Sequence, residues 1–215
     1  MVTIPLLLEN IIEKKPFLEE MLVRGLVNYA ALAEMLKPEL EKELKKEVKM
    51  PAVMMALRRL SEKMKLKLKP SPINFKESDV TVKSDIFEIT VMKSQTIINN
   101  IKKIYDLVNF QRGDFLTMTH GIYEITILSN RQYREKIKKI LEEEKIIKII
   151  DKLAALTVKI PIRAVETIGI FYSLTKAMTW ENINIIEIVS TLTELTLVLN
   201  EDDISKAFNT IKKLM

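Results

Sequence analysis

Cysteine is absent from this 215-residue sequence, and glycine and histidine are scarce. Without cysteine the chain has no disulfides, no thiolate metal ligands and no thiol nucleophile. The four glycines are scattered, which excludes a phosphate-binding glycine-rich loop and a dinucleotide fingerprint. The one histidine, His120, precedes Gly121, where we expect a turn residue rather than a metal ligand or catalytic base. We therefore expect no cofactor, no metal and no catalytic activity.

Long apolar runs are also missing, so no segment is predicted to span a membrane. The N-terminus has no basic stretch followed by an apolar core, which argues against a secretory signal. Hydrophobic residues make up 47% and charged residues 29% of the chain, a composition typical of globular proteins. These features predict a cytoplasmic protein.

The net charge of +5 is concentrated in the first third of the chain. Residues 58–69 alone hold six basic residues against one acidic residue, Glu62. Such a cluster is typical of a nucleic-acid surface, or of a solvated helix face followed by a basic linker. Both interpretations stay open. The nucleic-acid candidates are Arg58, Arg59, Lys63, Lys65 and Lys67.

Residues 1–69 show helical periodicity throughout, which predicts a helical domain. Pro16, Pro38 and Pro51 are each expected to open a helix, since proline lacks the N–H that is unpaired there. Asn28 is expected to cap the helix that follows it. Residues 28–36 resemble the first helix of a helix-turn-helix unit, with residues 51–64 as its recognition helix.

The segment Lys69-Pro70-Ser71-Pro72 marks the clearest boundary, because paired prolines disfavour helix. We expect a linker over residues 70–79, a first unit over 80–150 and a second over 151–215. The first unit shows the order β, α, β, β, α, β, and the same order begins again in the second. The predicted strands are 80–82, 86–92, 115–119, 122–128, 146–150, 153–160, 183–189 and 194–199.

The two units also match in sequence. Residues 124–130, EITILSN, parallel residues 194–200, ELTLVLN, and residues 137–140, IKKI, parallel residues 211–214, IKKL. Residues 88–91, EITV, parallel residues 155–158, ALTV. Three matches in the same order indicate a duplicated unit.

Residues 181–207 carry a resemblance to a known family. The run ENINIIEIVST, followed by TELTLVLNEDD and then Lys206-Ala207, is similar to the second half of an ACT domain, above all to the regulatory tail of aspartokinases. The resemblance implies an α+β fold: two ferredoxin-like βαββαβ units with antiparallel, interleaved sheets, following the helical N-terminal domain. It does not extend to a kinase domain, because the preceding residues are too few and lack phosphate-binding glycines.

The resemblance also implies an amino-acid effector bound between units, near the first βα loop of one and the second strand of its partner. The corresponding residues are Lys93, Ser94 and Gln95 in the first unit, and Ile162 and Arg163, after Pro161, in the second. Asn182 and Asn184 are the second-strand candidates. ACT units commonly pair, so a homodimer is expected.

This sequence departs from the family pattern twice. Both βα loops lack the usual Pro-Gly, whose glycine lets ligand atoms approach the backbone. The second unit lacks a fourth strand after its last helix, and we expect residues 80–83 to fill that position. Glu142, Glu143 and Glu144 are expected to form a solvated helix end rather than a metal site.

Three functions follow from these observations. The first is a non-catalytic regulator that senses an amino acid and acts through DNA or a partner enzyme. The second is a structural or protein-interaction module whose degenerate ACT units bind no ligand. The third, which the residues favour least, is a small enzyme using carboxylates or lysines.

Overall fold

The computed structural model describes residues 3–67, 78–162 and 166–215. It divides into two compact units, residues 1–70 and 71–215, which are described separately. The predicted joint at Lys69-Pro70-Ser71-Pro72 lies outside the described residues, as does most of the predicted linker. Within the described ranges, no helix combines the length and apolar character that crossing a membrane requires.

The first unit consists of four helices in its described part: α1 (Ile4–Glu13), α2 (Pro16–Val23), α3 (Tyr29–Leu44) and α4 (Met50–Lys67). Pro16 opens α2 as expected. The Asn28 side chain caps α3, accepting hydrogen bonds from Ala30 N at 3.0 Å and Ala31 N at 3.3 Å. The helical character predicted for this region is confirmed.

The helix predicted to open at Pro38 does not exist as a separate element, because Pro38 lies inside α3. An internal proline costs about 3 kcal/mol through its missing hydrogen bond and its clash with the preceding turn. Leu32, Leu36 and Leu40 nevertheless form one buried stripe that continues across the proline. Each buried leucine contributes about 1.5–3 kcal/mol, so the stripe outweighs the proline and keeps the helix continuous.

Helix α4 is the centre of this unit, since it contacts α1, α2 and α3. Its face made by Val53, Leu57, Leu60 and Met64 is buried. On the same helix the buried Ser61 hydroxyl donates a hydrogen bond of 2.7 Å to the carbonyl of Leu22, near the end of α2. The contact fixes α2 against α4 and leaves the opposite face of α4 exposed.

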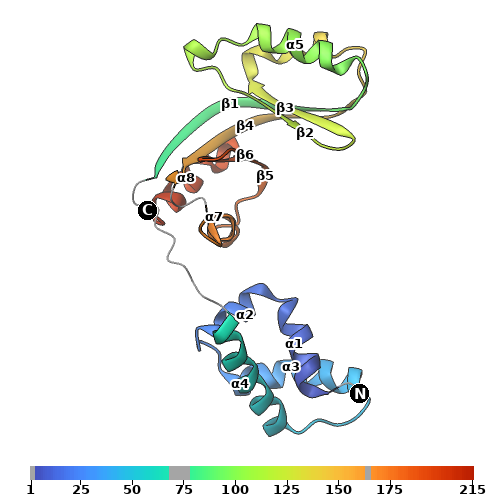
Figure 1. The fold of residues 1–215 in the computed structure, drawn as a ribbon, viewed down its shortest axis with the longest axis vertical. Helices are drawn as coiled ribbons and strands as arrows, with labels where there is room; N and C mark the ends of the chain where they lie inside the picture. The colour runs from blue at the N-terminus through green and yellow to red at the C-terminus, as the bar shows by residue number, and fades with distance from the viewer. Residues whose placement is uncertain (1–2, 68–77, 163–165) are drawn as a thin grey trace. The chain divides into compact units, whose positions relative to one another are not determined.

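The second unit is a six-stranded sheet with four α-helices over its described residues (Figure 1). The sheet order is β2-β3-β1-β4-β6-β5, and every neighbouring pair is antiparallel. The elements in chain order are β1 (Asp79–Met92), α5 (Ile97–Leu107), β2 (Leu116–His120), β3 (Glu124–Asn130), α6 (Arg134–Ile140), β4 (Ile146–Lys159), α7 (Ile170–Trp180), β5 (Ile185–Ser190), β6 (Glu194–Asn200) and α8 (Ile204–Lys212). The predicted α+β fold with ferredoxin-like units is confirmed.

Two long strands replace four of the predicted short ones. The sequence predicts breaks after residues 82 and 150, but β1 and β4 each run for 14 residues and pair along their length. The polar residues at the predicted breaks form an irregularity, where Asp85 and Lys152 adopt left-handed backbone with φ of 57° and 58°. Such a bulge bends a strand without ending it.

The long strands join the two halves of the sheet. Residues 79–83 of β1 pair with residues 155–159 of β4, beside β6, whereas residues 86–92 pair with β3. Figure 1 shows β1 and β4 running side by side through both halves. The start of β1 thus lies in the sheet of the second half, which makes the two halves interleaved.

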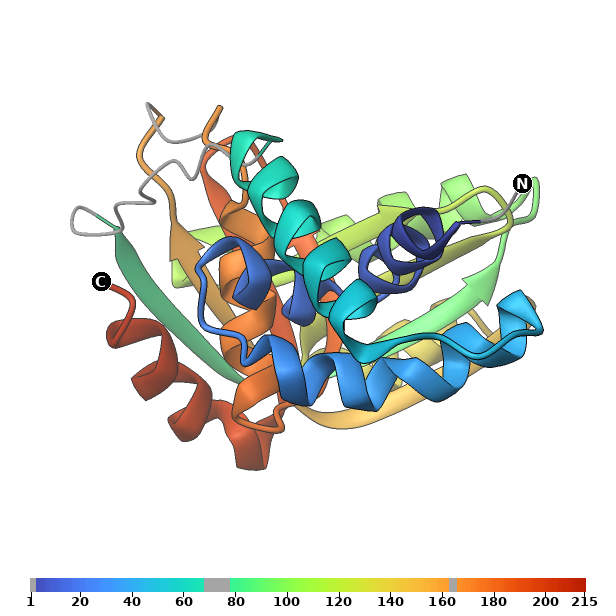
Figure 2. The ribbon, with the colours of Figure 1, turned by 90° about the horizontal axis from the view of Figure 1, so that it is seen from below.

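Each half has its own apolar core between helices and sheet. In the first half, Ile104 of α5 and Ile137 of α6 pack with Phe87 and Ile127. In the second half the buried residues of α7, α8 and the strands include Leu174, Met178, Ile211, Leu156 and Leu197. In Figure 2, α8 lies beside the first half of β1, which it contacts. A smaller buried cluster is made by strand residues alone, among them Ile86, Leu128 and Leu153.

Candidate functional site

The first predicted effector loop, Lys93-Ser94-Gln95, connects β1 to α5, and its residues are exposed. The Ser94 hydroxyl accepts a hydrogen bond of 3.0 Å from the N–H of Ile97, the first residue of α5. It also donates to a carboxylate, Glu144 Oε2, at 2.6 Å. The loop therefore presents its polar atoms to a group from elsewhere in the chain.

Glu144 lies between α6 and β4, and its side chain fills this loop. Its Oε1 accepts from the Thr96 hydroxyl at 2.8 Å and from the Asn100 amide at 2.9 Å. The hydrogen bond from Ser94, joined by those from Thr96 and Asn100, lowers the pKa of Glu144 against the opposing effect of burial. The residue is 8% exposed, so the prediction of a solvated Glu142–Glu144 end is wrong for Glu144.

The second predicted loop follows β4. Ile162 is 71% exposed there, and Arg163 lies outside the described residues. Helix α7 begins after Gly169, whose φ of 92° lies in the left-handed region that favours glycine. This loop therefore carries an exposed apolar side chain, and the helix that follows it has a glycine at its N-cap.

Asn182 and Asn184 were predicted to belong to the second strand of their unit. They lie instead in the turn between α7 and β5. Asn182 has a left-handed φ of 53°, and its N–H bonds the carbonyl of Thr179 at 3.0 Å. Asparagine tolerates this conformation better than most residues, so it ends the helix and delays the strand to Ile185. Both asparagine side chains are exposed.

A single chain does not bring these three groups together. The loop at residues 93–95 follows the end of β1, and residues 161–163 follow the end of its antiparallel neighbour β4. At roughly 3.3 Å per residue, the two ends of such a strand pair are tens of ångströms apart. The turn at residues 182–184 lies at an intermediate level, since Ile185 pairs with Leu199, and Leu199 with Ala154.

Comparison with solved structures identifies the fold. A structure of aspartokinase alpha and beta subunits aligns over 63% of this chain and 95% of its own, with 13% identity and a TM-score of 0.52. The ligand-free regulatory subunit of aspartate kinase from Thermus thermophilus aligns over 63% and 96%, with 12% identity and a TM-score of 0.50. Over that part, the chain shares the fold of an aspartate kinase regulatory subunit.

Another aspartate kinase matches over part of its own length. Aspartate kinase from Clostridium acetobutylicum gives a TM-score of 0.53 at 17% identity, and the match covers 63% of this chain but 34% of that enzyme. No family model and no curated protein matches the sequence. At these identities the comparison confirms the fold expected from the resemblance, and the effector residues remain predictions.

The predicted nucleic-acid residues lie on α4. Arg58, Arg59, Lys63 and Lys65 are exposed, and Lys67 is the last residue of the helix, its side chain outside the description. Two are engaged within the first unit. The Lys63 ammonium is 2.6 Å from Glu9 Oε1, and the Arg58 guanidinium lies 5.9 Å from the centre of the Tyr29 ring. Lys63 and Arg58 therefore already have partners within the unit, which would compete with a phosphate for these two side chains.

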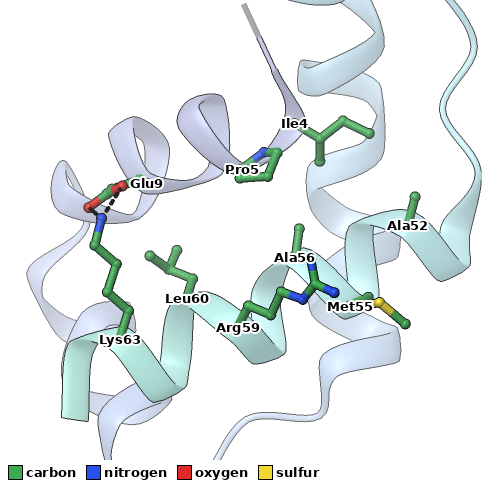
Figure 3. Close-up of a pocket in the computed structure, with 9 residues that line it drawn as sticks. All are labelled: Ile4, Pro5, Glu9, Ala52, Met55, Ala56, Arg59, Leu60 and Lys63. Carbon is green, nitrogen blue, oxygen red and sulfur yellow. Dashed lines mark hydrogen bonds and ion pairs between the residues drawn. The ribbon is translucent and has the colours of Figure 1, made fainter. Parts of the chain in front are cut away.

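An apolar hollow of about 410 Å³ adjoins these side chains. It lies between α1 and α4, and Figure 3 shows the Lys63–Glu9 pair at one end and Arg59 along one side. Its apolar lining comes from Ile4, Pro5, Ala52, Met55, Ala56 and Leu60. An apolar depression of this kind fits a hydrophobic side chain better than a sugar-phosphate backbone.

Sequence reasoning did not single out Glu88, a residue of β1. Glu88 is 5% exposed, and its Oε2 has no hydrogen-bond partner in the part of the chain that the structure describes. Burial, helped by the charge of Glu187, raises the pKa of Glu88, while the Thr90 hydroxyl and Lys148 oppose the rise. The described residues hold no group of three or more His, Cys, Asp or Glu side chains suited to a metal ion.

Proposed function

We propose that this chain is a non-catalytic regulatory protein whose ACT-like unit binds a small effector, an amino acid. The observation that supports the proposal is the fold shared with aspartate kinase regulatory subunits, matched over 96% and 95% of two such structures. The step from this fold to effector binding is an analogy with those subunits, and the titrations below test it.

The effector site proposed here lies in the second half of the ACT-like unit. The side chains of Asn182 and Asn184 are exposed and carry amide groups that pair with the carboxylate or ammonium of an amino acid. The loop at Ile162 and Arg163 supplies the other side of the site from a second copy of the chain, because Ile162 follows the end of β4, whereas the turn at Asn182 lies near the level of Ala154. Effector binding and dimerisation are thus coupled in this proposal.

Calorimetric titration of the purified full chain with each of the twenty common amino acids tests the proposal. We expect saturable heat with one or a few of them. Asn184→Ala combined with Asn182→Gly, which keeps the left-handed backbone, should weaken that binding by about tenfold or more, equivalent to about 1.4 kcal/mol. Asn209→Ala, at an exposed position on α8, is the matched control. Absence of heat with all twenty, on folded protein, refutes the proposal.

The second candidate function is an interaction module that binds no small ligand, and Glu144 favours it. The first loop already holds a carboxylate from its own chain, which leaves no vacant receptor there. In that case the same titrations give no heat, while a partner protein still binds.

The helical unit is the proposed output of the regulator, acting on a partner enzyme or on DNA. The hollow between α1 and α4 supports a protein partner, and the basic side chains of α4 support DNA. Salt dependence separates the two, because phosphate contacts release counterions and give a steep salt slope. Arg58→Ala with Arg59→Ala should flatten that slope if DNA is the partner.

A further inference from the structure

The Glu144 carboxylate is bound as fully as a ligand would be. Each of its oxygens accepts at least one hydrogen bond, Oε2 from Ser94 and Oε1 from Thr96 and Asn100, at 2.6–2.9 Å. All three donors are neutral. The 11-residue helix α5 adds the positive end of its dipole, because Ser94 and Thr96 immediately precede its first turn. The receptor is therefore built for one negative charge.

The carboxylate comes from a distant part of the sequence. Glu144 lies 50 residues after Ser94, in the short turn that leads from α6 into β4. The turn is anchored next to the loop by a second contact, in which the N–H of Met92 bonds the carbonyl of Lys145 at 2.9 Å. Glu144 thus ties the end of α6 to the start of α5.

We propose that Glu144 is a built-in ligand of the first βα loop, which holds the loop in one conformation and excludes an external carboxylate. The site that it occupies, made by Ser94, Thr96 and Asn100, takes a small carboxylate when Glu144 is removed. Given the proposed function, on which this last step rests, the effector is left to the second half of the unit.

The charge of the occupant is matched to its receptor. Ser94 donates to Oε2 and Thr96 donates to Oε1, so both carboxylate oxygens act as acceptors. Protonation of either oxygen of Glu144 would weaken or break one of these hydrogen bonds. Hydrogen bonding from Ser94 and its neighbours also lowers the pKa of Glu144, so the carboxylate remains charged at and below neutral pH. A neutral ligand of the same shape would be a poor substitute.

Hydrogen exchange of the full chain, read over residues 93–100, tests the inference. In Glu144→Ala we expect the amides at the start of α5 to exchange faster by about tenfold or more, since the loop loses its ligand. Sodium acetate should restore protection in this variant, while sodium chloride at equal ionic strength should not. Glu143→Ala, which removes an exposed neighbouring carboxylate, should behave as wild type in both salts.

Besides a failure of acetate to restore protection, two exchange results overturn the inference. One is unchanged exchange in Glu144→Ala. The other is acetate protection that persists when Ser94→Ala and Thr96→Val are added to Glu144→Ala, because that combination lacks the receptor. If Glu144→Ala does not fold, the Glu144 carboxyl is titrated by NMR in wild type and in Ser94→Ala, at an exposed position. Its pKa should rise in the variant, and an unchanged value overturns the inference.

The acetate experiment needs no effector, so it separates the two proposals. Failure of acetate to restore protection overturns the built-in ligand and leaves effector binding in the second half untouched. Absence of heat with every amino acid overturns the proposed function, whatever acetate does at the first loop.

Discussion

Replacing Glu88 by glutamine should stabilise the second unit above mildly acidic pH. The carboxylate is 5% exposed, and its Oε1 receives a long hydrogen bond of 3.4 Å from Thr90. The other oxygen, Oε2, has no partner among the described residues. Leaving one buried polar atom unpaired costs about 1–3 kcal/mol, and more for a charged group. Burying the neutral amide of glutamine costs less than burying the carboxylate, but it still costs something. We therefore expect the free energy of unfolding to rise by about 1–2 kcal/mol near pH 7.

The pH dependence gives the sharper signature. Burial and Glu187 raise the pKa of Glu88 above its ordinary value of 4.5, so the native state binds protons more tightly than the unfolded chain. The wild-type free energy of unfolding therefore contains a contribution that is complete below pH 4.5 and is lost as the pH rises through the native pKa. Glu88→Gln should lack this loss.

Urea unfolding followed by tryptophan fluorescence measures the effect. The single tryptophan, Trp180, lies at the end of α7 and so reports on this unit. Glu194→Gln, an exposed residue of β6, makes the same chemical change as a control. Parallel stability curves for wild type and Glu88→Gln between pH 4.5 and 8 would refute the reasoning.

Three further predictions concern other parts of the chain. Lys152→Gly should raise the free energy of unfolding by about 1 kcal/mol in urea titrations, because its left-handed φ of 58° strains any side chain; a loss would contradict this. Ser61→Ala should lower thermal stability by about 1–2 kcal/mol, since the Leu22 carbonyl loses a buried partner; an unchanged melting temperature would count against it. In electrophoretic mobility assays, Arg58→Ala with Arg59→Ala should weaken any DNA binding and reduce its salt slope by about 2, and an unchanged slope would exclude α4 as the contact.

The sequence predicted the fold class because its periodicities are strong. Apolar residues at helical spacing predicted the helices of the first unit. The repeated strand motifs that begin at Glu124 and Glu194 predicted two similar halves in the second unit. Its errors lie where local signals and tertiary packing disagree. Pro38 signals a helix start, but the leucine stripe on both sides holds one helix together. Asp85 and Lys152 look like breaks, yet strand pairing continues through them.

The candidate site was less predictable. The loop after β1 was located correctly by residue number, but its occupant was not, because Glu144 sits in a run of three glutamates that looks uniformly solvated. The local sequence does not distinguish Glu144 from Glu143. The difference arises in the tertiary structure, where the start of α5 lies against the turn between α6 and β4. Glu88 was not singled out because a glutamate that alternates with apolar residues on a strand is expected to face solvent, whereas residues 86–91 of β1 are all buried.

The central claim is that the ACT-like unit binds an amino-acid effector. Hydrogen exchange of the full chain, with and without a mixture of the twenty common amino acids, tests it most directly. The account predicts slower exchange confined to residues 78–215, including the turn around Asn182, and unchanged exchange at Ile97–Asn100, where Glu144 already sits. Identical exchange along the whole chain in both samples would contradict it.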